Sequence, residues 1–272
     1  YHPDQQPWIN RRLNRLLIAK AISEADVVVT PSDSTARDIP RFVGSVPGDV
    51  RVIPWGVDPA VFHPLAEEQI AGVLSRHGVA RPYILSLDVF NPRKNFLAAL
   101  EGVARLSEEL RTSLTVVGVG VPRKTATGTS VQARADVLGL SGRLCLVGDV
   151  RPADLAALYS GALALVYPSI YEGFGMPVLE AMASGCPVIT ADRSSLPEVA
   201  GGAALLVDPS DPGQLTRAVA LVSTDQGERA RLVAAGRMRA AGFTWRRTAE
   251  EMVAVFERAL AAHPGWTGRW AR

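Results

Sequence analysis

The sequence predicts an α/β protein built on a doubly wound parallel sheet. Short runs rich in valine, isoleucine and leucine recur along the 272-residue chain. These runs are apolar nearly throughout, which is typical of parallel strands that are covered on both faces. Helical patterns fill the gaps between them, and such an alternation of strands and helices indicates a sheet with helices on both sides.

The predicted strands are Asp26–Thr30, Val50–Pro54, Tyr83–Leu87, Leu114–Gly118, Leu144–Gly148, Leu163–Pro168, Pro187–Ala191 and Ala203–Val207. The predicted helices are Ile9–Glu24, Asn95–Glu108, Pro152–Ser160, Pro177–Ser184, Asp211–Val222 and Arg246–Ala261. Sheets of this kind bind ligands at the carboxyl ends of their strands. Functional residues are therefore expected in the loops that follow the strands.

A domain boundary is expected near Gly56–Pro64, a turn-rich stretch that contains two prolines. The residues before it supply about two strand–helix units, which is too few for a complete domain. The residues after it supply enough strands for one complete domain. The chain opens on Tyr1 in a segment without a start-like character, so we expect an upstream part to be missing.

Composition and charge exclude several classes of protein. The net charge is only +2, which gives no indication of a nucleic-acid partner. Cys145 and Cys186 both lie in apolar stretches, which favours free thiols in a reducing, cytoplasmic setting. No apolar run approaches the roughly 20 residues of a membrane span, and no signal peptide is visible.

The most informative stretch is Ser169–Gly185, which follows a predicted strand. Gly173 and Gly175 flank Phe174 in a loop, Pro177 suits the first turn of a helix, and the final glycine suits the helix end. A glycine-rich loop that leads into a helix N-terminus presents free N–H groups and the positive end of the helix dipole. These features predict an anion site.

Two carboxylates belong to this stretch, Glu172 in the loop and Glu180 in the helix. Carboxylates accept hydrogen bonds from paired sugar hydroxyls, so they suit a sugar ligand. Glu180 has small or apolar neighbours, and a buried carboxylate needs a polar partner. Alternatively, Glu180 favours the start of the helix electrostatically and Glu172 is a surface loop residue. Because both flank one Gly-Phe-Gly loop, we interpret the pair as functional.

A pair of cations, Arg93 and Lys94, follows the strand Tyr83–Leu87. Asn95 is predicted to cap the next helix. Two cations at a helix N-terminus are electrostatically unfavourable, and a diphosphate bound between them and the helix would correct this. Two solvated surface charges are an equally good interpretation of these residues taken alone.

The sequence EGFGMPVLEAMASG at 172–185 resembles the E-x7-E signature of retaining glycosyltransferases of the GT-B fold, in the large group-4 family. Further segments resemble those of the family, in the family's order and over essentially the whole chain: DVVVTPSDST, VRVIPWGVDPAVFHP, PRKN, LVGDV, SSLPEVAGGAALLVDPSD and FTW. The resemblance implies that 1–56 ends an N-terminal acceptor-side Rossmann-like domain and that 57–242 is a complete C-terminal donor-binding domain. It also implies that 243–272 is a helix that crosses back to the first domain.

The resemblance implies roles for individual residues as well. Glu172 is expected to contact the donor hexose, and Glu180 the ribose of the nucleotide. Lys94 is expected to bind the donor phosphates and stabilise the leaving diphosphate, with Arg93 as a second cation. Sugar hydroxyls and the distal phosphate are expected at the backbone amides of Gly173, Phe174, Gly175 and Met176.

Weaker candidates come from two other loops. Gly118 and Gly120 belong to a glycine-rich turn where the family often contacts the donor, although a plain loop is an equally good interpretation. Val150 lies in LVGDV, where the family holds the base through backbone groups. The segment Ser195–Glu198 is predicted to be a structural capping box.

Two residues depart from the family pattern. Asp88 stands where the family usually has glycine, and Val89 stands where many members have arginine. An extra carboxylate near a diphosphate is unfavourable unless it points away or binds something. The departures lower the expected catalytic strength without changing the expected fold.

The functional hypothesis is retaining transfer of a hexose from GDP-mannose or a UDP-sugar to a hydroxyl of a glycan or lipid-linked acceptor. No cofactor and no metal are expected, because the four histidines have no metal-ligand spacing and Asp-x-Asp is absent. One alternative is a fragment that binds a nucleotide sugar without catalysis of its own. Another is a sugar-nucleotide epimerase that shares the fold, which product analysis would distinguish.

The expected location is the cytoplasm, with a possible position at the inner face of the membrane. The segment Ile9–Lys20 combines basic residues with leucines and could lie on a membrane surface. A domain helix with a basic outer face is the alternative interpretation of this segment.

Overall fold

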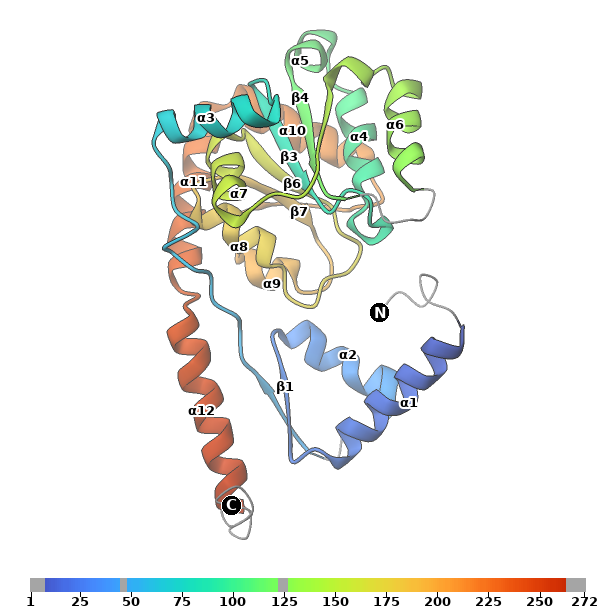
Figure 1. Ribbon diagram of the computed structural model, residues 1–272, viewed down its shortest axis with the longest axis vertical. Helices are drawn as coiled ribbons and strands as arrows, with labels where there is room; N and C mark the ends of the chain where they lie inside the picture. The colour runs from blue at the N-terminus through green and yellow to red at the C-terminus, as the bar shows by residue number, and fades with distance from the viewer. Residues whose placement is uncertain (1–7, 45–47, 122–126, 263–272) are drawn as a thin grey trace. The chain divides into compact units, whose positions relative to one another are not determined.

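The computed structural model describes residues 8–44, 48–121 and 127–262, and the side chains of all of these except 8–15 and 127–130. The chain divides into two compact units (Figure 1). One unit consists of Tyr1–Gly56 together with Phe243–Arg272, and the other of Val57–Gly242.

The larger unit is built on a six-stranded parallel sheet with the strand order β5-β4-β3-β6-β7-β8. Its strands are β3 (Tyr83–Leu87), β4 (Thr115–Val119), β5 (Leu144–Val147), β6 (Ala164–Tyr167), β7 (Val188–Ala191) and β8 (Leu205–Val207). From β3 the chain adds β4 and β5 toward one edge of the sheet. It then crosses back to place β6 on the other side of β3 and continues with β7 and β8 toward the opposite edge. The topological switch point, where sheets of this kind bind ligands, therefore lies between β3 and β6.

Helices cover both faces of this sheet (Figure 1). One face carries α4 (Phe96–Ala104), α6 (Thr127–Val137) and α10 (Pro212–Thr224). The other face carries α3 (Glu67–His77), α7 (Pro152–Gly161), α8 (Met176–Ala183) and α9 (Leu196–Ala200), with α11 (Gln226–Ala241) packed on α8. The remaining helical elements are α5 (Glu108–Ser113) and two 3-10 turns, Pro92–Lys94 and Ser141–Arg143.

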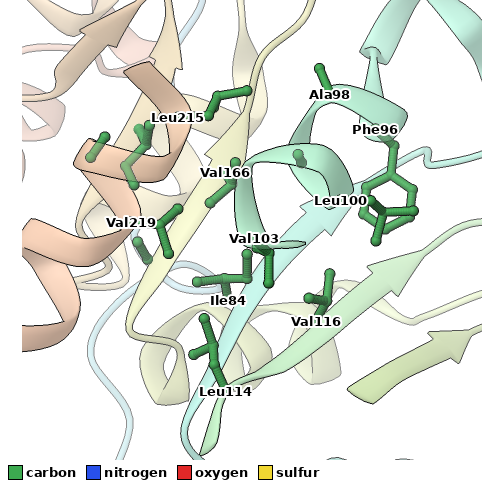
Figure 2. Packing of buried hydrophobic residues seen from close by; sticks show 14 of the residues in the cluster. Ile84, Phe96, Ala98, Leu100, Val103, Leu114, Val116, Val166, Leu215 and Val219 are labelled. Carbon is green, nitrogen blue, oxygen red and sulfur yellow. The ribbon is translucent and has the colours of Figure 1, made fainter. Parts of the chain in front are cut away.

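The main hydrophobic core lies between the sheet and the helices α4 and α10 (Figure 2). The sheet side chains and the helix side chains that meet there are fully or almost fully buried: Ile84, Leu100, Val103, Val116, Val166, Leu215 and Val219. Gly102 permits a close approach of the two helices, because a Cβ at this position would lie 2.8 Å from the Cβ of Leu215. This packing fixes the central strands whose ends carry the polar loops described below.

The smaller unit contains the parallel strands β1 (Val27–Thr30) and β2 (Asp49–Val52) with the helices α1 (Trp8–Glu24), α2 (Asp33–Val43) and α12 (Trp245–Ala262). The side chain of Thr248 donates a hydrogen bond to the carbonyl of Pro54 over 2.8 Å. A Cβ on Gly56 would lie only 2.1 Å from the backbone nitrogen of Trp245. The start of α12 therefore packs directly on the end of the 1–56 segment.

All of the predicted strands are present, with ends that differ by one or two residues. The helix predicted at Asn95–Glu108 is present as α4 but ends four residues earlier, at Ala104. Ser107 then starts a new helix by accepting a hydrogen bond from the N–H of Leu110. Six of the described helices, α2, α3, α5, α6, α9 and α11, were not predicted.

The segment Ile9–Lys20 is helical and belongs to α1. The side chains of Arg11, Arg12 and Arg15 lie outside the described residues, whereas Leu16 and Leu17 are exposed. Among the described helices, none is long and apolar enough to cross a membrane.

Candidate functional site

The loops that follow β3 and β6 lie side by side at the carboxyl edge of the sheet. Pairing of Ile84 with Ala164 brings these two strands together. Beyond the strands, the backbone N–H of Ile170 donates to the carbonyl of Arg93 over 2.9 Å, and the hydroxyl of Ser169 lies 3.1 Å from the same carbonyl. The switch point therefore joins the segment that contains Arg93 and Lys94 to the segment that contains Glu172.

A tight turn aims Lys94 into the protein. The side-chain oxygen of Asn91 accepts a hydrogen bond from the N–H of Arg93, and the carbonyl of Asn91 accepts one from the N–H of Lys94. Pro92 opens the 3-10 turn that follows Asn91. As a result, Lys94 is only 9% exposed, which excludes its interpretation as a solvated surface charge.

Asn95 is the N-cap residue of α4, as predicted, but its side chain makes no cap hydrogen bond. The residue adopts a left-handed conformation, with a φ of 55°. Its side-chain amide instead donates to the carbonyl of Pro209 over 2.8 Å, which ties the β3 loop to the loop after β8.

Glu172 is the centre of a buried cluster of charges. Its two carboxylate oxygens lie 2.6 Å from the ammonium of Lys94 and 2.7 Å from the guanidinium of Arg93. The hydroxyls of Tyr167 and Ser169 add hydrogen bonds of 2.8 and 2.7 Å to the oxygen that faces Lys94. Glu172 is 7% exposed, so its interpretation as a surface loop residue is wrong.

Tyr167 links the cation and the carboxylate of this cluster. Its hydroxyl also accepts a hydrogen bond from Lys94, whose ammonium lies 4.9 Å from the centre of the tyrosine ring. Burial, together with the negative charge of Glu172, raises the pKa of Tyr167 well above its ordinary value. Tyr167 therefore remains a neutral donor to Glu172.

The protonation of the cluster follows from the competition between burial and pairing. Burial by itself would raise the pKa of Glu172, but the Lys94 charge and the hydrogen bonds from Lys94, Ser169 and Arg93 outweigh it, so the pKa is lowered. Burial lowers the pKa of Lys94, and the attraction of Glu172 opposes this shift. The carboxylate of Glu172 is consequently held ionised.

Two serines after β7 fix the backbone around Glu172. The hydroxyl of Ser194 accepts a hydrogen bond from the N–H of Glu172 over 2.9 Å. The hydroxyl of Ser195 lies 2.9 Å from the carbonyl of Glu172 and 2.6 Å from that of Phe174. Ser195 makes no side-chain cap to α9, so the predicted capping box is wrong, and this serine instead supports the candidate site.

The Gly-Phe-Gly loop leads directly into α8. Phe174 is 3% exposed and anchors the loop in the core. Gly175 is the residue before the helix and has a φ of 116°, a conformation that side chains rarely adopt. Met176 and Pro177 then form the first turn. The helix N-terminus therefore lies a few residues after Glu172, as the sequence predicts for an anion site.

Glu180 lies one turn along α8 and has a single hydrogen bond to its side chain. The hydroxyl of Tyr159, on α7, donates to a carboxylate oxygen over 3.0 Å. Burial raises the pKa of Glu180, and the hydrogen bond from Tyr159 offsets only part of that shift. The need of this carboxylate for a polar partner, predicted from its apolar neighbours, is therefore met only in part.

The weaker candidates lie at the same edge of the sheet but differ in setting. Gly118 is inside β4, where a Cβ would lie 3.1 Å from Leu146 and from Val89, so close packing accounts for the glycine. Gly120 follows β4 and uses its N–H to bind the carbonyl of Val147. Val150 is half-buried in the loop after β5. The end of the glycine-rich turn, at 122–124, lies outside the described residues.

Comparison with known proteins identifies the family. Residues 75–239 match the family described as Glycosyl transferases group 1, and residues 1–61 match Glycosyltransferase Family 4. The chain belongs to the group 1 glycosyl transferases. The family resemblance predicted from the EGFGMPVLEAM segment is therefore confirmed.

Individual relatives of this group 1 glycosyl transferase include two mannosyltransferases. The chain is 34% identical over 251 residues to the MMP alpha-(1->4)-mannosyltransferase of Mycolicibacterium hassiacum, covering 90% of this chain and 56% of that protein. It is 28% identical over 259 residues to O-antigen chain mannosyltransferase B of Escherichia coli, covering 94% of this chain and 66% of that protein. The chain thus spans less than two thirds of the length of both relatives.

A solved structure confirms the predicted fold of this group 1 glycosyl transferase. The sucrose-phosphate synthase of Thermosynechococcus elongatus superimposes with a TM-score of 0.81 at 25% identity, over 96% of this chain and 64% of that one. The parallel α/β architecture is therefore that of the GT-B glycosyltransferases.

Proposed function

We propose that this chain is the donor-binding part of a retaining glycosyltransferase that transfers a hexose from a nucleoside-diphosphate sugar to a hydroxyl acceptor. The observation that carries the proposal is the buried cluster of Arg93, Lys94 and Glu172 at the switch point of the sheet. Two cations converge there on one anion, beside a glycine-rich loop that opens a helix. A diphosphate needs this set of charges and N–H groups.

Glu172 lies in the anion position next to Arg93 and Lys94. A donor diphosphate would compete with Glu172 for these two cations, which would then face the phosphate oxygens. The released carboxylate would accept hydrogen bonds from hydroxyls of the hexose. Tyr167 and Ser169, which both contact Glu172, would keep the carboxylate oriented toward the sugar.

In the proposed reaction, the bond between the anomeric carbon and the distal phosphate oxygen breaks, and the acceptor oxygen bonds to the same face of that carbon. The proton of the acceptor hydroxyl passes to the departing phosphate oxygen. Arg93 and Lys94 stabilise the negative charge that develops on the diphosphate. Amides of the loop from Gly173 to Met176 support the sugar hydroxyls and the distal phosphate.

Glu180 is proposed to bind the ribose of the donor. Its carboxylate has one hydrogen-bond donor, Tyr159, and a raised pKa because of burial. Two vicinal ribose hydroxyls would supply the donors that the protein does not, and would favour the ionised form.

The proposed donor is GDP-mannose, with a UDP-sugar as the alternative. The names of two relatives, both mannosyltransferases, support a mannose donor. The proposed acceptor is a hydroxyl of a growing glycan or of a lipid-linked sugar. No metal is assigned a role, because two cationic side chains already face the proposed diphosphate position.

A second candidate is a unit that binds the nucleotide sugar without catalysing transfer on its own. The coverage of 56% and 66% of two relatives favours this candidate for the chain as given. Donor hydrolysis or transfer by this chain alone would exclude it.

The first test is calorimetric titration of the chain with GDP, UDP and ADP, repeated with Glu180→Ala. We expect one nucleotide to bind selectively, and the substitution to weaken it by about tenfold, which corresponds to one lost charge-assisted hydrogen bond. Absence of binding to all three nucleotides by the folded chain would contradict the proposal.

The second test is turnover of Lys94→Ala in an enzyme that contains this chain and transfers sugar. Loss of a charge that stabilises the leaving group predicts a fall of about 10²- to 10³-fold. The matched control is Lys20→Ala, at an exposed lysine whose recorded ion pair is with Glu24 on the same helix. Unchanged turnover of Lys94→Ala would contradict the assignment of the phosphate site.

A further inference from the structure

Asp88 adopts the left-handed backbone conformation, in which residues other than glycine are uncommon. It follows β3 directly and has a φ of 50°, in the left-handed region. Glycine adopts this region without strain, whereas a residue with a Cβ adopts it at some cost. Glycine would form the same turn at lower cost, so aspartate at this position adds a carboxylate that the turn itself does not require.

The carboxylate of Asp88 belongs to the same loop as the two cations. Asn91, whose carbonyl and side chain shape the turn before Lys94, donates its side-chain amide to a carboxylate oxygen of Asp88 over 2.8 Å. The carbonyl of Asp88 in turn accepts the N–H of Asn91. These two contacts orient the half-buried aspartate within the turn that presents Arg93 and Lys94.

The charge of Asp88 reaches the candidate site. Burial lowers the pKa of Lys94, Glu172 opposes this shift most strongly, and Asp88 opposes it as well. After burial and the nearby Glu172, Asp88 also contributes to the raised pKa of Tyr167. The Asp88 carboxylate therefore lies within electrostatic range of the group proposed to bind the donor phosphate.

Asp88 changes the charge balance that a ligand meets. Arg93 and Lys94 carry one positive charge each, and Glu172 neutralises one of them. Asp88 adds a second negative charge without pairing directly with either cation, so that the four side chains together carry no net charge. The added negative charge weakens the binding of a more negative ligand to a greater extent, because Coulomb repulsion scales with the charge of the ligand.

The donor and the product of the proposed reaction differ in charge at the distal phosphate. In a nucleoside-diphosphate sugar this phosphate is esterified and carries one negative charge. In the free nucleoside diphosphate it is a terminal phosphate, whose second ionisation has a pKa of about 6, so it is close to doubly charged at pH 7.

We propose that Asp88 is a specificity-determining residue that weakens the binding of the free nucleoside diphosphate more than the binding of the nucleoside-diphosphate sugar. This inference rests on the proposed function. Asp88 thereby favours release of the product nucleoside diphosphate and binding of the next nucleoside-diphosphate sugar. It acts through charge, with Asn91 as the residue that positions it.

The test compares the chain with its Asp88→Asn variant by calorimetric titration with GDP and GDP-mannose, and with UDP and UDP-glucose, at pH 7.5 and low salt without divalent cations. Asparagine tolerates the left-handed conformation and retains an oxygen for the amide of Asn91, so the substitution removes the charge alone. The matched control is Asp192→Asn, at an exposed carboxylate after β7 on the same edge of the sheet.

We expect Asp88→Asn to tighten the free diphosphate by about fivefold to tenfold, and the sugar nucleotide by about twofold to threefold. Asp192→Asn is expected to leave both affinities unchanged. Equal changes for the two ligands, or no change, would overturn the role of Asp88. Weaker binding of the free diphosphate by the Asp88→Asn variant would overturn it too, whether or not added Mg²⁺ restores the affinity of the unmodified chain.

The outcome also separates this inference from the proposed function. If the unmodified chain binds a nucleotide and Glu180→Ala weakens it, but Asp88→Asn has no effect, only the inference fails. If neither the folded chain nor the Asp88→Asn variant binds any of the four ligands, the proposed function fails and the inference fails with it.

Discussion

Glu172 and Glu180 belong to one short segment, yet the protein treats their carboxylates in opposite ways. Glu172 meets two cations and two hydroxyls, whereas the side chain of Glu180 receives one hydrogen bond, from Tyr159. The pKa of Glu172 is lowered and that of Glu180 is raised. Burial pushes both upward, so the difference comes from the partners that each carboxylate meets.

This difference separates a carboxylate whose ionised form the fold stabilises from one whose ionised form the fold opposes. Replacing Glu172 removes the anion that pairs with the buried Lys94 and the half-buried Arg93. Replacing Glu180 removes a charge that the ligand-free protein would be better without. Substitutions at the two positions are therefore expected to change stability in opposite directions.

The largest expected effect is that of Glu172→Gln, which removes the carboxylate that pairs with both Arg93 and Lys94. We expect a loss of about 3 kcal/mol in the free energy of unfolding at pH 7, as for other broken buried pairs. Since the folded pKa is lowered, the stabilisation by Glu172 is present above its unfolded pKa and is lost as the pH falls through the folded value. The difference between the two proteins should therefore shrink below about pH 4.

Urea unfolding at pH 7 and in acid measures this effect. The control is the double variant Glu172→Gln with Lys94→Met, which removes one of the stranded cations. Recovery of part of the lost stability in the double variant is expected, since the two residues are in contact. Equal stability of Glu172→Gln and the unmodified protein at pH 7 would contradict the comparison.

The second effect is that of Tyr159→Phe, which removes the one hydroxyl bound to the Glu180 side chain. A loss of about 1 kcal/mol is expected, as for a typical hydrogen bond. The pKa of Glu180 should rise further, because Tyr159 lowers it in the unmodified protein. NMR titration of the Glu180 carboxyl measures this change, and an unchanged titration would show that Tyr159 does not support the charge.

The smallest effect is that of Glu180→Gln on the ligand-free protein. A raised folded pKa means that ionisation of Glu180 opposes folding above its unfolded pKa, and that this penalty disappears as the pH falls. We expect the melting temperature to rise by about 1–2 °C at pH 7, with no gain in acid. Glu250→Gln, at an exposed position of α12, is the control. A lower melting temperature for Glu180→Gln at pH 7 would reverse the comparison.

The central strands β3, β4, β6 and β7 could be predicted because their side chains are buried on both faces, which gives a continuous apolar run. The six missed helices lack that signal, and α11 in particular is rich in arginine along Gln226–Ala241. The family could be predicted from one long motif. The order of the strands in the sheet could not be predicted, because a single sequence does not show which strands are neighbours.

Because the sequence does not show which strands are neighbours, some contacts and residues of the candidate site could not be predicted from it. Arg93, Lys94 and Glu172 were each predicted as site residues, but their mutual pairing depends on the contact between β3 and β6. Tyr167 was overlooked because an aromatic residue at the end of an apolar run resembles core. Ser195 was assigned to a local cap because the spacing S-x-x-E fits one, whereas its hydroxyl contacts carbonyls more than 20 positions earlier in the chain.

The central place of β3 has a consequence for synthesis on the ribosome. Its partner on one side, β4, emerges soon after it, whereas β6 emerges only after β5 and α7 have been made. Until Ala164 and Leu165 are available, one edge of this fully buried strand has no neighbour to pair with. An unpaired apolar edge can join another chain. The nascent chain is therefore most prone to aggregate in the interval between the two halves of the sheet.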